Sequence, residues 1–573
     1  MSEFNACGES IPWISPRDWL KFIVDRGLWH RLAGLSDADR HLSPMVWKQF
    51  WDHYKTLNPD FSLFSMENVD YGNMAALFVH GDEGRMLKKS GIMITALQSA
   101  LGFGFDTKRM KRDRNGLFVL RVNYVGHTYT TRMVTSAIPK HLYESKPEVF
   151  YEAMDVLSQE LQDLLLVGVF DPVTKQHYKA CVIGTKGDWP YLAKVAKFTR
   201  TFQSGAKKGG TKRHGNGKPT GGICHLCLAG QDEFPYEEIA TQSPRWLRTV
   251  GVSMPWHEPP AFIERLCHDQ ADPASFFHGD PWHGFHLGIG KAFVASTVHL
   301  CLQVIPARTL ELKWPWLSEH YKKFCREKKL QPHITKITPN LMSYNDKTGV
   351  KGCWSKGALT SNFMRWLPCL LRDLPADNDG VLENCYDAAT KMNSLFGYLF
   401  NSPLFLNRDE SLYIAHLGFS FLKSYSELAR YCFDAKRGWL YPLFPKLHSL
   451  HHMIIKLHAD AKSCGMSMSP LATACQQDED CVGRLARVSR RVSPRLTMLR
   501  TLQRYLIGAY DVWTKAGLIH PLWCLDCRRL HEKITCFPAI AFLGRGFHMF
   551  PLKLWFSKNR VFFEKHCYSR NMR

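Results

Sequence analysis

Apolar residues recur at helical spacing along much of the chain. The segment 13–60, rich in Trp and Phe, repeats them every three or four positions, which predicts helices with one buried face. The same stripe runs through Phe150–Leu164, Val381–Phe400 and Glu410–Phe433. We therefore expect a helical front part, one long helix in the first half of the chain, and a mostly helical stretch over 290–460.

Shorter apolar or alternating runs, bounded by turn residues, predict strands. Met74–His80 ends in Gly-Asp-Glu-Gly, and His177–Ile183 ends in Gly-Thr-Lys-Gly-Asp. Gly116–Val125 and His127–Val134 are also strand-like. With the helix that begins near Phe150 between them, this order predicts a mixed α/β sheet with carboxylates at strand ends.

The patterns divide the chain into six regions. We expect an N-terminal helical region over 1–65, the first part of the sheet domain over 66–200, a basic loop and a Cys/His-rich insertion over 201–290, an α-helical insertion over 291–460, completion of the sheet domain over 461–515 and a basic Cys/His-containing tail over 516–573. No apolar run is long enough to span a bilayer, and the first residues lack the features of a signal peptide. The sequence thus predicts neither a membrane segment nor secretion.

The composition is that of a globular protein and the charge is strongly positive. Of 573 residues, 45% are hydrophobic and 22% charged, which excludes a mostly disordered chain and a coiled-coil rod. Lys and Arg number 74 against 52 Asp and Glu, a formal net charge of +22. This excess favours a polyanionic partner, and nucleic acid is the first such class.

The positive charge is clustered in two stretches without any acid. One is the Gly/Lys-rich loop at 205–218, and the other is 481–510, which has seven arginines. Pro494 should divide the second stretch into two helical pieces with a break near Ser493. A phosphate backbone explains such clusters better than a solvated surface does, which is the alternative. The residues that we expect to bind nucleic acid are Lys207, Lys208, Lys212, Arg213, Arg484, Arg487, Arg490, Arg491 and Arg495.

A carboxylate follows the first and the last of the predicted strands, Met74–His80 and His177–Ile183. Asp82 and Asp188 lie where a strand ends, so they are rigidly held and open to solvent, as a Mg²⁺ site for phosphoryl transfer requires. The acidic run 478–480 directly precedes the arginines. Taken singly, each Asp is explained by a turn, and the acidic run by a helix N-terminus. Together they predict a metal site with one acid from 478–480.

Cysteine and histidine spacing suggests zinc. Cys224-x2-Cys227 is half of a common zinc site, and Asp280, His283 and His286 can supply the other half. The alternative is a pair of buried cysteines beside a capped helix. Two further groups can bind metal but have simpler explanations, namely Cys524-x2-Cys527-x3-His531-x4-Cys536 and His448-x2-His451-His452.

The order of these motifs resembles that of the DDE transposases of eukaryotic cut-and-paste elements, nearest to the CACTA (En/Spm-like) group. GDWP at 187–190, CHLC at 224–227 and DPWHGFHLG at 280–288 follow one another, after Asp82 and before the acids at 478–480. The resemblance spans roughly residues 70–510.

The resemblance implies an RNase H-like core with a zinc-binding insertion and a large α-helical insertion. Asp82, Asp188 and Glu479 would be the catalytic acids that hold two Mg²⁺ or Mn²⁺ ions, and Zn²⁺ would be structural. The activity implied is hydrolysis of a DNA phosphodiester followed by strand transfer, in the nucleus, and a homo-oligomer is compatible with it. HGDEGR at 80–85 departs from the Asp-Gly-Phe-like run of plant members.

Two other functions stay open at this point. The first is a non-catalytic, zinc-stabilised nucleic-acid-binding protein derived from a transposable element. The second is a different metal phosphoesterase that uses His448, His451 and His452. The three functions differ in which set of side chains meets in the folded chain.

Overall fold

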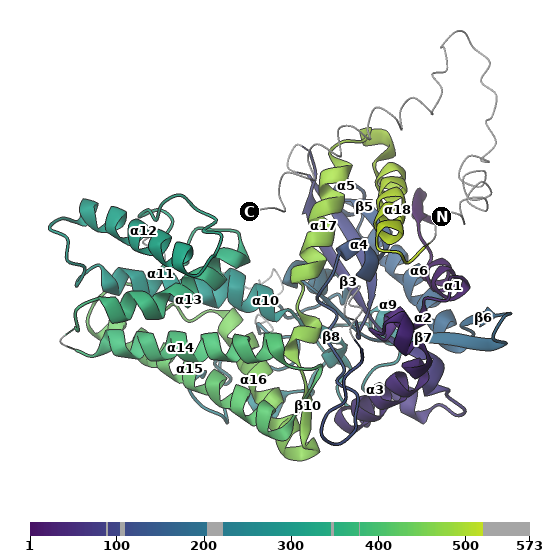
Figure 1. Ribbon diagram of the computed structural model, residues 1–573, viewed down its shortest axis with the longest axis horizontal. Helices are drawn as coiled ribbons and strands as arrows, with labels where there is room; N and C mark the ends of the chain where they lie inside the picture. The colour runs from purple at the N-terminus through teal and green to yellow at the C-terminus, as the bar shows by residue number, and fades with distance from the viewer. Residues whose placement is uncertain (88–89, 103–108, 203–221, 345–348, 378, 520–573) are drawn as a thin grey trace, which may run out of the picture. The chain divides into compact units, whose positions relative to one another are not determined.

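The protein is a mixed α/β protein with a six-stranded mixed sheet and many helices. The computed structural model describes residues 1–87, 90–102, 109–202, 222–344, 349–377 and 379–519 (Figure 1). Met1–Leu518 form one compact unit. Among these described residues, no helix combines the length and the apolar character needed to cross a membrane.

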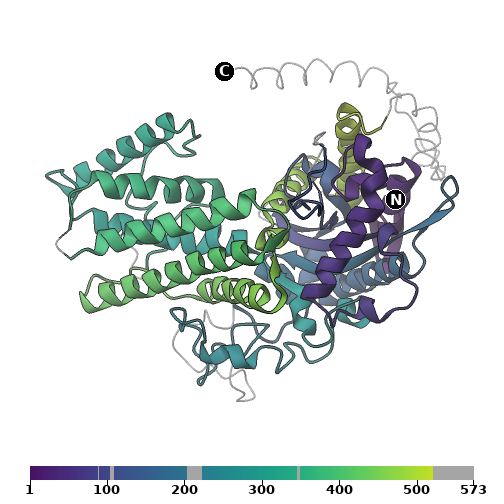
Figure 2. The ribbon, with the colours of Figure 1, turned by 60° about the horizontal axis from the view of Figure 1, so that its bottom comes forward.

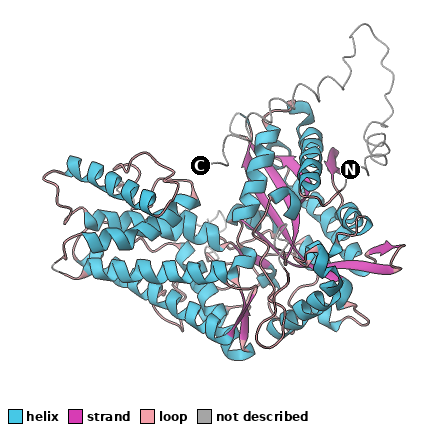
Figure 3. Cartoon of the chain, in the orientation of Figure 1, coloured by secondary structure: helices cyan, strands magenta, loops and turns pink. Residues whose placement is uncertain are grey.

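The sheet is built from strands far apart in the sequence (Figure 3). Its strands are β3 (Met74–Arg85), β4 (Gly91–Ser99), β5 (Met133–Pro139), β6 (Val169–Asp171), β7 (Gln176–Gly187) and β8 (Phe277–Gly279). The order is β5-β4-β3-β7-β6, and β8 pairs with the end of β7. β3 and β8 run parallel to β7, whereas the β3–β4, β4–β5 and β6–β7 pairs are antiparallel.

Two of the predicted strands need correction, and β4 was not predicted at all. β4 has no alternating pattern because every residue in it is buried, so the sequence shows no period for it. Gly116–Val125 contains only isolated bridges, such as Leu101 to Val122, instead of a strand. His127–Val134 begins as the short helix α4 (Thr128–Thr131), and β5 starts only at Met133.

The helices that pack on the sheet come from two distant parts of the chain, α6 before β7 and α17 and α18 near residue 500. α6 (Pro147–Leu166), predicted from its apolar stripe, contacts β7. α17 (Gln476–Ser489) contacts β3 and β4, and α18 (Thr497–Lys515) contacts β5. A Cβ on Gly84 of β3 would lie 2.8 Å from the Ala486 Cβ of α17, so glycine allows this helix to pack closely. Residues 461–515 therefore pack onto the sheet formed before residue 200.

The N-terminal region begins with a hairpin that its helical pattern does not predict. β1 (Ser2–Ala6) pairs with β2 (Glu9–Trp13) across a two-residue turn, Cys7-Gly8, with φ values of 50° and 88°. Positive φ at both positions is the geometry of tight hairpin turns. The expected helices follow as α1 (Pro16–Asp25), α2 (Trp29–Leu32) and α3 (Ser43–Leu57).

The stretch 290–460 is mostly helical, as expected. Its helices are α11 (Gly290–Cys301), α12 (Leu310–Glu327), α13 (Gly357–Asp373), α14 (Val381–Asn401), α15 (Arg408–Asp434) and α16 (Pro445–Cys464). α13, α14, α15 and α16 lie side by side in this order (Figure 2). The short strands β9 (Phe405–Asn407) and β10 (Met466–Met468) pair at one end of α15 and α16. Shorter helices elsewhere are α5 (Lys140–Glu144), α7 (Trp189–Val195), α9 (Ala261–Arg265) and α10 (Pro281–Gly284).

Candidate active site and metal centre

Two aspartates lie next to each other where β3 and β7 stop pairing. The last parallel pair is Gly81 with Gly187, and the next residues are Asp82 and Asp188. β3 continues past this point by pairing with β4, so Asp82 lies within a strand, whereas the sequence suggested a turn. Asp188 begins α7 and accepts a hydrogen bond from the Tyr191 N–H at 2.8 Å.

Glycine is required at the end of this pair of strands. A Cβ on Gly81 would lie 2.0 Å from the Tyr191 ring. A Cβ on Gly187 would lie 2.5 Å from the Gly81 carbonyl oxygen. Both separations are far below van der Waals contact. The two glycines therefore let α7 lie against the strand ends that carry the aspartates.

Glu479 reaches the same place from α17. Side chains alternate along a strand, so Asp82 faces the same side of β3 as Gly84, which is the side that α17 covers. Glu479 lies one turn before Val482, which also contacts Gly84. The carboxyl group of Glu479 is near enough to that of Asp82 to raise the pKa of Asp82. We call Asp82, Asp188 and Glu479 the acid centre.

The neighbouring acids point elsewhere. Asp478 is fully buried, with ion pairs to the Arg132 Nε at 2.9 Å and the Lys186 Nζ at 3.0 Å. Burial alone would raise the pKa of Asp478, but these two cations hold the pKa well below its ordinary value. Asp480 accepts hydrogen bonds from Arg484 at 2.6 Å and from Thr128 at 3.1 Å. Of the three adjacent acids, only Glu479 faces Asp82.

The acid centre is electrostatically unfavourable without a cation. Burial and the nearby Glu479 raise the pKa of Asp82 well above its usual range. Burial and the charge of Asp82 raise the pKa of Asp188 to about 7, and burial also raises the pKa of Glu479. Carboxylates held together in a buried place repel one another, and a divalent cation removes that cost. The oxygen ligands fit Mg²⁺ or Mn²⁺.

His283 joins the acid centre. Its Nδ1 lies 2.6 Å from Asp280 Oδ2, and its Nε2 lies 3.3 Å from Glu479 Oε1. Asp280 is buried and also accepts the Cys475 N–H at 3.1 Å, which joins the start of α10 to the segment before α17. Burial would lower the pKa of His283, but its bond to Asp280 and the surrounding carboxylates raise it. Asp280 and His283 thus belong beside the acids.

A second cluster contains Cys224, Cys227, His448 and His452, and we call it the Cys/His cluster. One ligand atom from each residue lies within 4.8 Å of all the others. Cys227 Sγ lies 3.4 Å from His448 Nε2 and 3.3 Å from His452 Nε2, and Cys224 Sγ lies 3.6 Å from His452 Nε2. Two thiolates and two imidazoles are a common ligand set for structural zinc.

The chain around the Cys/His cluster is arranged for thiolates. Cys224 and Cys227 lie in a tight loop in which the Leu226 N–H donates to Cys224 Sγ and the Ala229 N–H donates to Cys227 Sγ, at 3.4 and 3.5 Å. The Trp246 ring packs against both histidines, with centroid distances of 4.4 and 4.3 Å. The group is consistent with a buried zinc site.

The two predicted cysteines lie in a group that is consistent with a zinc site, but the residues predicted for its other half lie elsewhere. Asp280 and His283 face the acid centre, and His286 is buried against Phe285 and Phe396. Helix α16 supplies the ligands instead. The spacing of His448 and His452, four positions apart on one helical face, was the available signal.

His451 does not belong to either site. It is not among the four residues whose ligand atoms come together, and it packs edge-on against Trp246 and Phe419, at 5.3 and 6.1 Å. The three histidines of α16 therefore do not form a common catalytic group, which removes the basis of the histidine phosphoesterase hypothesis. A further buried group, His80, Cys475 and Asp478, shares an acid that Arg132 and Lys186 already neutralise.

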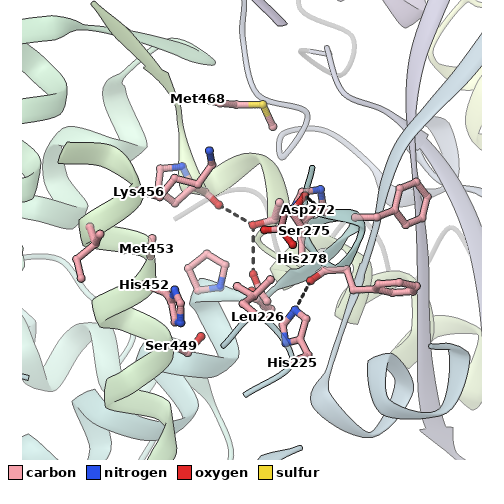
Figure 4. Close-up of a pocket in the computed structure, with 18 of the residues that line it drawn as sticks. His225, Leu226, Asp272, Ser275, His278, Ser449, His452, Met453, Lys456 and Met468 are labelled. Atoms are coloured by element: carbon pink, nitrogen blue, oxygen red, sulfur yellow. Dashed lines mark hydrogen bonds between the residues drawn. The ribbon is translucent and has the colours of Figure 1, made fainter. Parts of the chain in front are cut away.

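A cavity of about 460 Å³ borders the Cys/His cluster (Figure 4). Its wall includes His225 and His452 near the cluster, His278 of β8, and Lys456 and Met453 of α16. Lys456 donates to Asp460 at 3.2 Å. The cavity thus lies between α16, the cysteine loop and the edge of the sheet.

The arginines of 484–495 form an exposed surface with one exception. Arg484 is half-buried and paired with Asp480, whereas Arg487, Arg490, Arg491 and Arg495 are exposed. We call these four the Arg face. Arg490 donates to the Arg85 carbonyl oxygen at 2.6 and 2.8 Å, so this part of the Arg face is fixed at the end of β3.

The predicted break in this basic stretch is confirmed. α17 ends at Ser489, and a short turn at Pro494–Leu496 precedes α18. The other predicted nucleic-acid contacts, Lys207, Lys208, Lys212 and Arg213, lie outside the described residues, as does the cysteine group that begins at Cys524.

Comparison with known proteins gives no assignment. No protein-family model matches the chain, and a search of curated proteins finds no match. A proposal for the function therefore has to rest on the geometry of the acid centre and of the Cys/His cluster.

Proposed function

We propose that the protein is a transposase-like enzyme that cleaves DNA phosphodiesters and transfers strands by two-metal chemistry, with Asp82, Asp188 and Glu479 as its catalytic acids. The observation that carries the proposal is that these three carboxyl groups lie near enough for the charge of one to raise the pKa of another. They come from a strand, from the end of the parallel strand beside it, and from a helix almost 300 residues later in the chain. Burying three carboxylates close together costs free energy, because burial and mutual repulsion both disfavour their charged forms. A purely structural role does not explain why the protein bears this cost.

The sheet topology supports an RNase H-like core. Three antiparallel strands, β3, β4 and β5, are followed by the long helix α6 and then by β7, parallel to β3. β8 extends the sheet parallel to β7 after the cysteine loop. In this arrangement the first acid lies on the central strand and the second directly after its parallel neighbour. The resemblance to CACTA-type DDE transposases implies the same arrangement.

The chain's own groups have separable tasks in this reaction. Asp82, Asp188 and Glu479 would hold two Mg²⁺ or Mn²⁺ ions, and the chemistry that such ions would supply is activation of the attacking oxygen and stabilisation of the leaving one. Among the described residues, oxygen atoms of the three acids do not all lie within 4.8 Å of one another, as the ligand atoms of the Cys/His cluster do. His283, held by Asp280, orients the Glu479 carboxyl group.

Zn²⁺ at the Cys/His cluster would have a structural task. It would connect the loop of Cys224 and Cys227 to α16 of the helical insertion. No ligand position is left for a substrate when two thiolates and two imidazoles bind the ion, so catalysis at the zinc itself is not proposed.

The Arg face would bind the DNA backbone. It begins at Arg487, two turns after Glu479 on the same helix, α17. Phosphates bound by these arginines would therefore lie near the acid centre. Such contacts carry no sequence information. A protein with this activity on chromosomal DNA works in the nucleus.

The test is metal binding and DNA cleavage in matched variants. Asp82→Asn, Asp188→Asn and Glu479→Gln should each weaken Mn²⁺ binding, measured by calorimetry on zinc-loaded protein, and abolish Mn²⁺-dependent nicking of supercoiled plasmid. Asp480→Asn is the control, because its carboxylate faces Arg484 instead. Normal Mn²⁺ affinity in all three variants would contradict the proposal. DNA binding without any nicking by the wild-type protein would favour a non-catalytic, element-derived DNA-binding protein.

A further inference from the structure

The segment 280–290, which carries His283, accepts hydrogen bonds from two of the later helices, α13 and α16. The His286 carbonyl oxygen accepts a hydrogen bond from Thr360 of α13 at 2.6 Å. A Cβ on Gly357, also in α13, would lie 2.8 Å from the Trp282 indole, so α13 packs directly against this segment. The hydrogen bonds from α16 hold the same segment through another side chain, Lys446.

The Lys446 Nζ donates to the His283 carbonyl oxygen at 2.9 Å and to the Leu287 carbonyl oxygen at 3.2 Å. The side chain therefore bridges both ends of the irregular turn that follows α10.

Gly288 makes room for this side chain. A Cβ at Gly288 would lie 2.3 Å from Lys446 Cδ and 3.1 Å from Lys446 Nζ. The φ of Gly288 is not positive, so the backbone itself does not require glycine there. By contrast, a Cβ at Gly284, in the same segment, would meet no atom within 4 Å. The close approach of Lys446 is thus the reason for glycine at position 288.

Lys446 shares the first two turns of α16 with His448 and His452. These two histidines contact Cys227 and Cys224, while Lys446 contacts the backbone of His283, whose ring contacts Glu479. One rigid helical end therefore belongs to both clusters. A change in the position of this end moves the Lys446 ammonium group relative to the turn that it holds.

We propose that Lys446 is a positioning residue that couples occupancy of the Cys/His cluster to the placement of His283. Metal at the Cys/His cluster fixes the start of α16, and Lys446 then holds the 280–290 segment so that His283 meets Glu479. Any effect of this coupling on catalysis rests on the proposed function. The coupling itself, between metal at the Cys/His cluster and the position of His283, does not. Loss of the metal should loosen the 280–290 segment without opening the sheet.

The experiment is hydrogen–deuterium exchange of the full chain, zinc-loaded and zinc-depleted, with zinc content measured separately. In the wild type, zinc removal should speed amide exchange in 280–290 about tenfold or more, the loss expected for charge-assisted hydrogen bonds. Exchange in β4, which is buried in the sheet, should not change and serves as the internal reference.

Lys446→Met keeps the length of the side chain and removes the donor. It should bind zinc normally, exchange quickly in 280–290 even when loaded, and show no further increase on depletion. Lys462→Met, an exposed lysine at the other end of α16, is the control. Gly288→Ala should reproduce the effect of Lys446→Met, and Gly284→Ala should not.

Two results would overturn the coupling. One is unchanged exchange of 280–290 after confirmed loss of zinc from the wild type. The other is the same zinc-dependent increase in Lys446→Met as in the wild type, since the coupling would then take another route. If the coupling is found and the wild type neither binds Mn²⁺ nor nicks DNA, the proposed function fails and the positioning role stands.

Discussion

Three consecutive acids, Asp478, Glu479 and Asp480, should respond in three different ways to loss of their charge. Asp478→Asn leaves two cations, Arg132 and Lys186, without their partner in a place where all three side chains are at most 1% exposed. Breaking a buried ion pair costs about 3–5 kcal/mol. Lys186 keeps a bond to the Ala474 carbonyl oxygen at 2.9 Å, so we expect a loss near the lower end of that range.

The other two substitutions should cost little. The Asp480 side chain is 42% exposed, and its pair with Arg484 is of the surface kind that contributes at most about 1 kcal/mol. Glu479→Gln removes one of the mutually repelling carboxylates. The metal-free acid centre should therefore keep or gain stability, while Mn²⁺ affinity falls.

The assay is urea unfolding of zinc-loaded protein without other divalent cations, with Mn²⁺ binding measured in parallel. The expected order of destabilisation is Asp478→Asn, then Asp480→Asn, then Glu479→Gln. A Glu479→Gln variant as unstable as Asp478→Asn would show that Glu479 is a structural partner instead of a metal ligand. Equal stabilities of the variants at 478 and 480 would refute the assignment of the buried ion pairs.

Three further predictions concern the DNA surface, the strand end and pH. Replacing Arg487 and Arg491 with Ala should reduce the slope of log K against log salt by about 0.9 for each lost phosphate contact, with no change in sequence preference; an unchanged slope would mean that the Arg face is only solvated. Gly81→Ala should cost several kcal/mol in urea unfolding because its Cβ meets the Tyr191 ring at 2.0 Å, whereas Gly397→Ala, with open space around it in α14, should stabilise by up to about 1 kcal/mol. Because the native pKa of Asp188 is raised to about 7, the folded metal-free protein binds this proton more tightly than the unfolded chain, so its stability should fall as pH rises from about 4 to 7; added Mn²⁺ should restore stability most at pH 7, and a flat metal-free profile would contradict the geometry of the acid centre.

Features with a local cause could be predicted from the sequence. The stripes of α6, α14 and α15 are visible because a helix that buries one face repeats every 3.6 residues. Proline lacks an N–H donor and disfavours a helical residue before it, so a break in the basic stretch near Pro494 was also predictable. β4 was not, since a strand that is buried on both sides loses its alternation.

Which side chains meet was decided only by the tertiary structure. Successive residues of a helix point about 100° apart, so the sequence could not tell which of three adjacent acids faces Asp82. That choice depends on Arg132, 346 residues before Asp478. The zinc ligands show the same limit, because Cys227 and His448 are 221 residues apart and the nearer His283 was the plausible partner. Spacing along the chain governs contacts within one element, but contacts between elements depend on how the helical insertion packs back on the sheet.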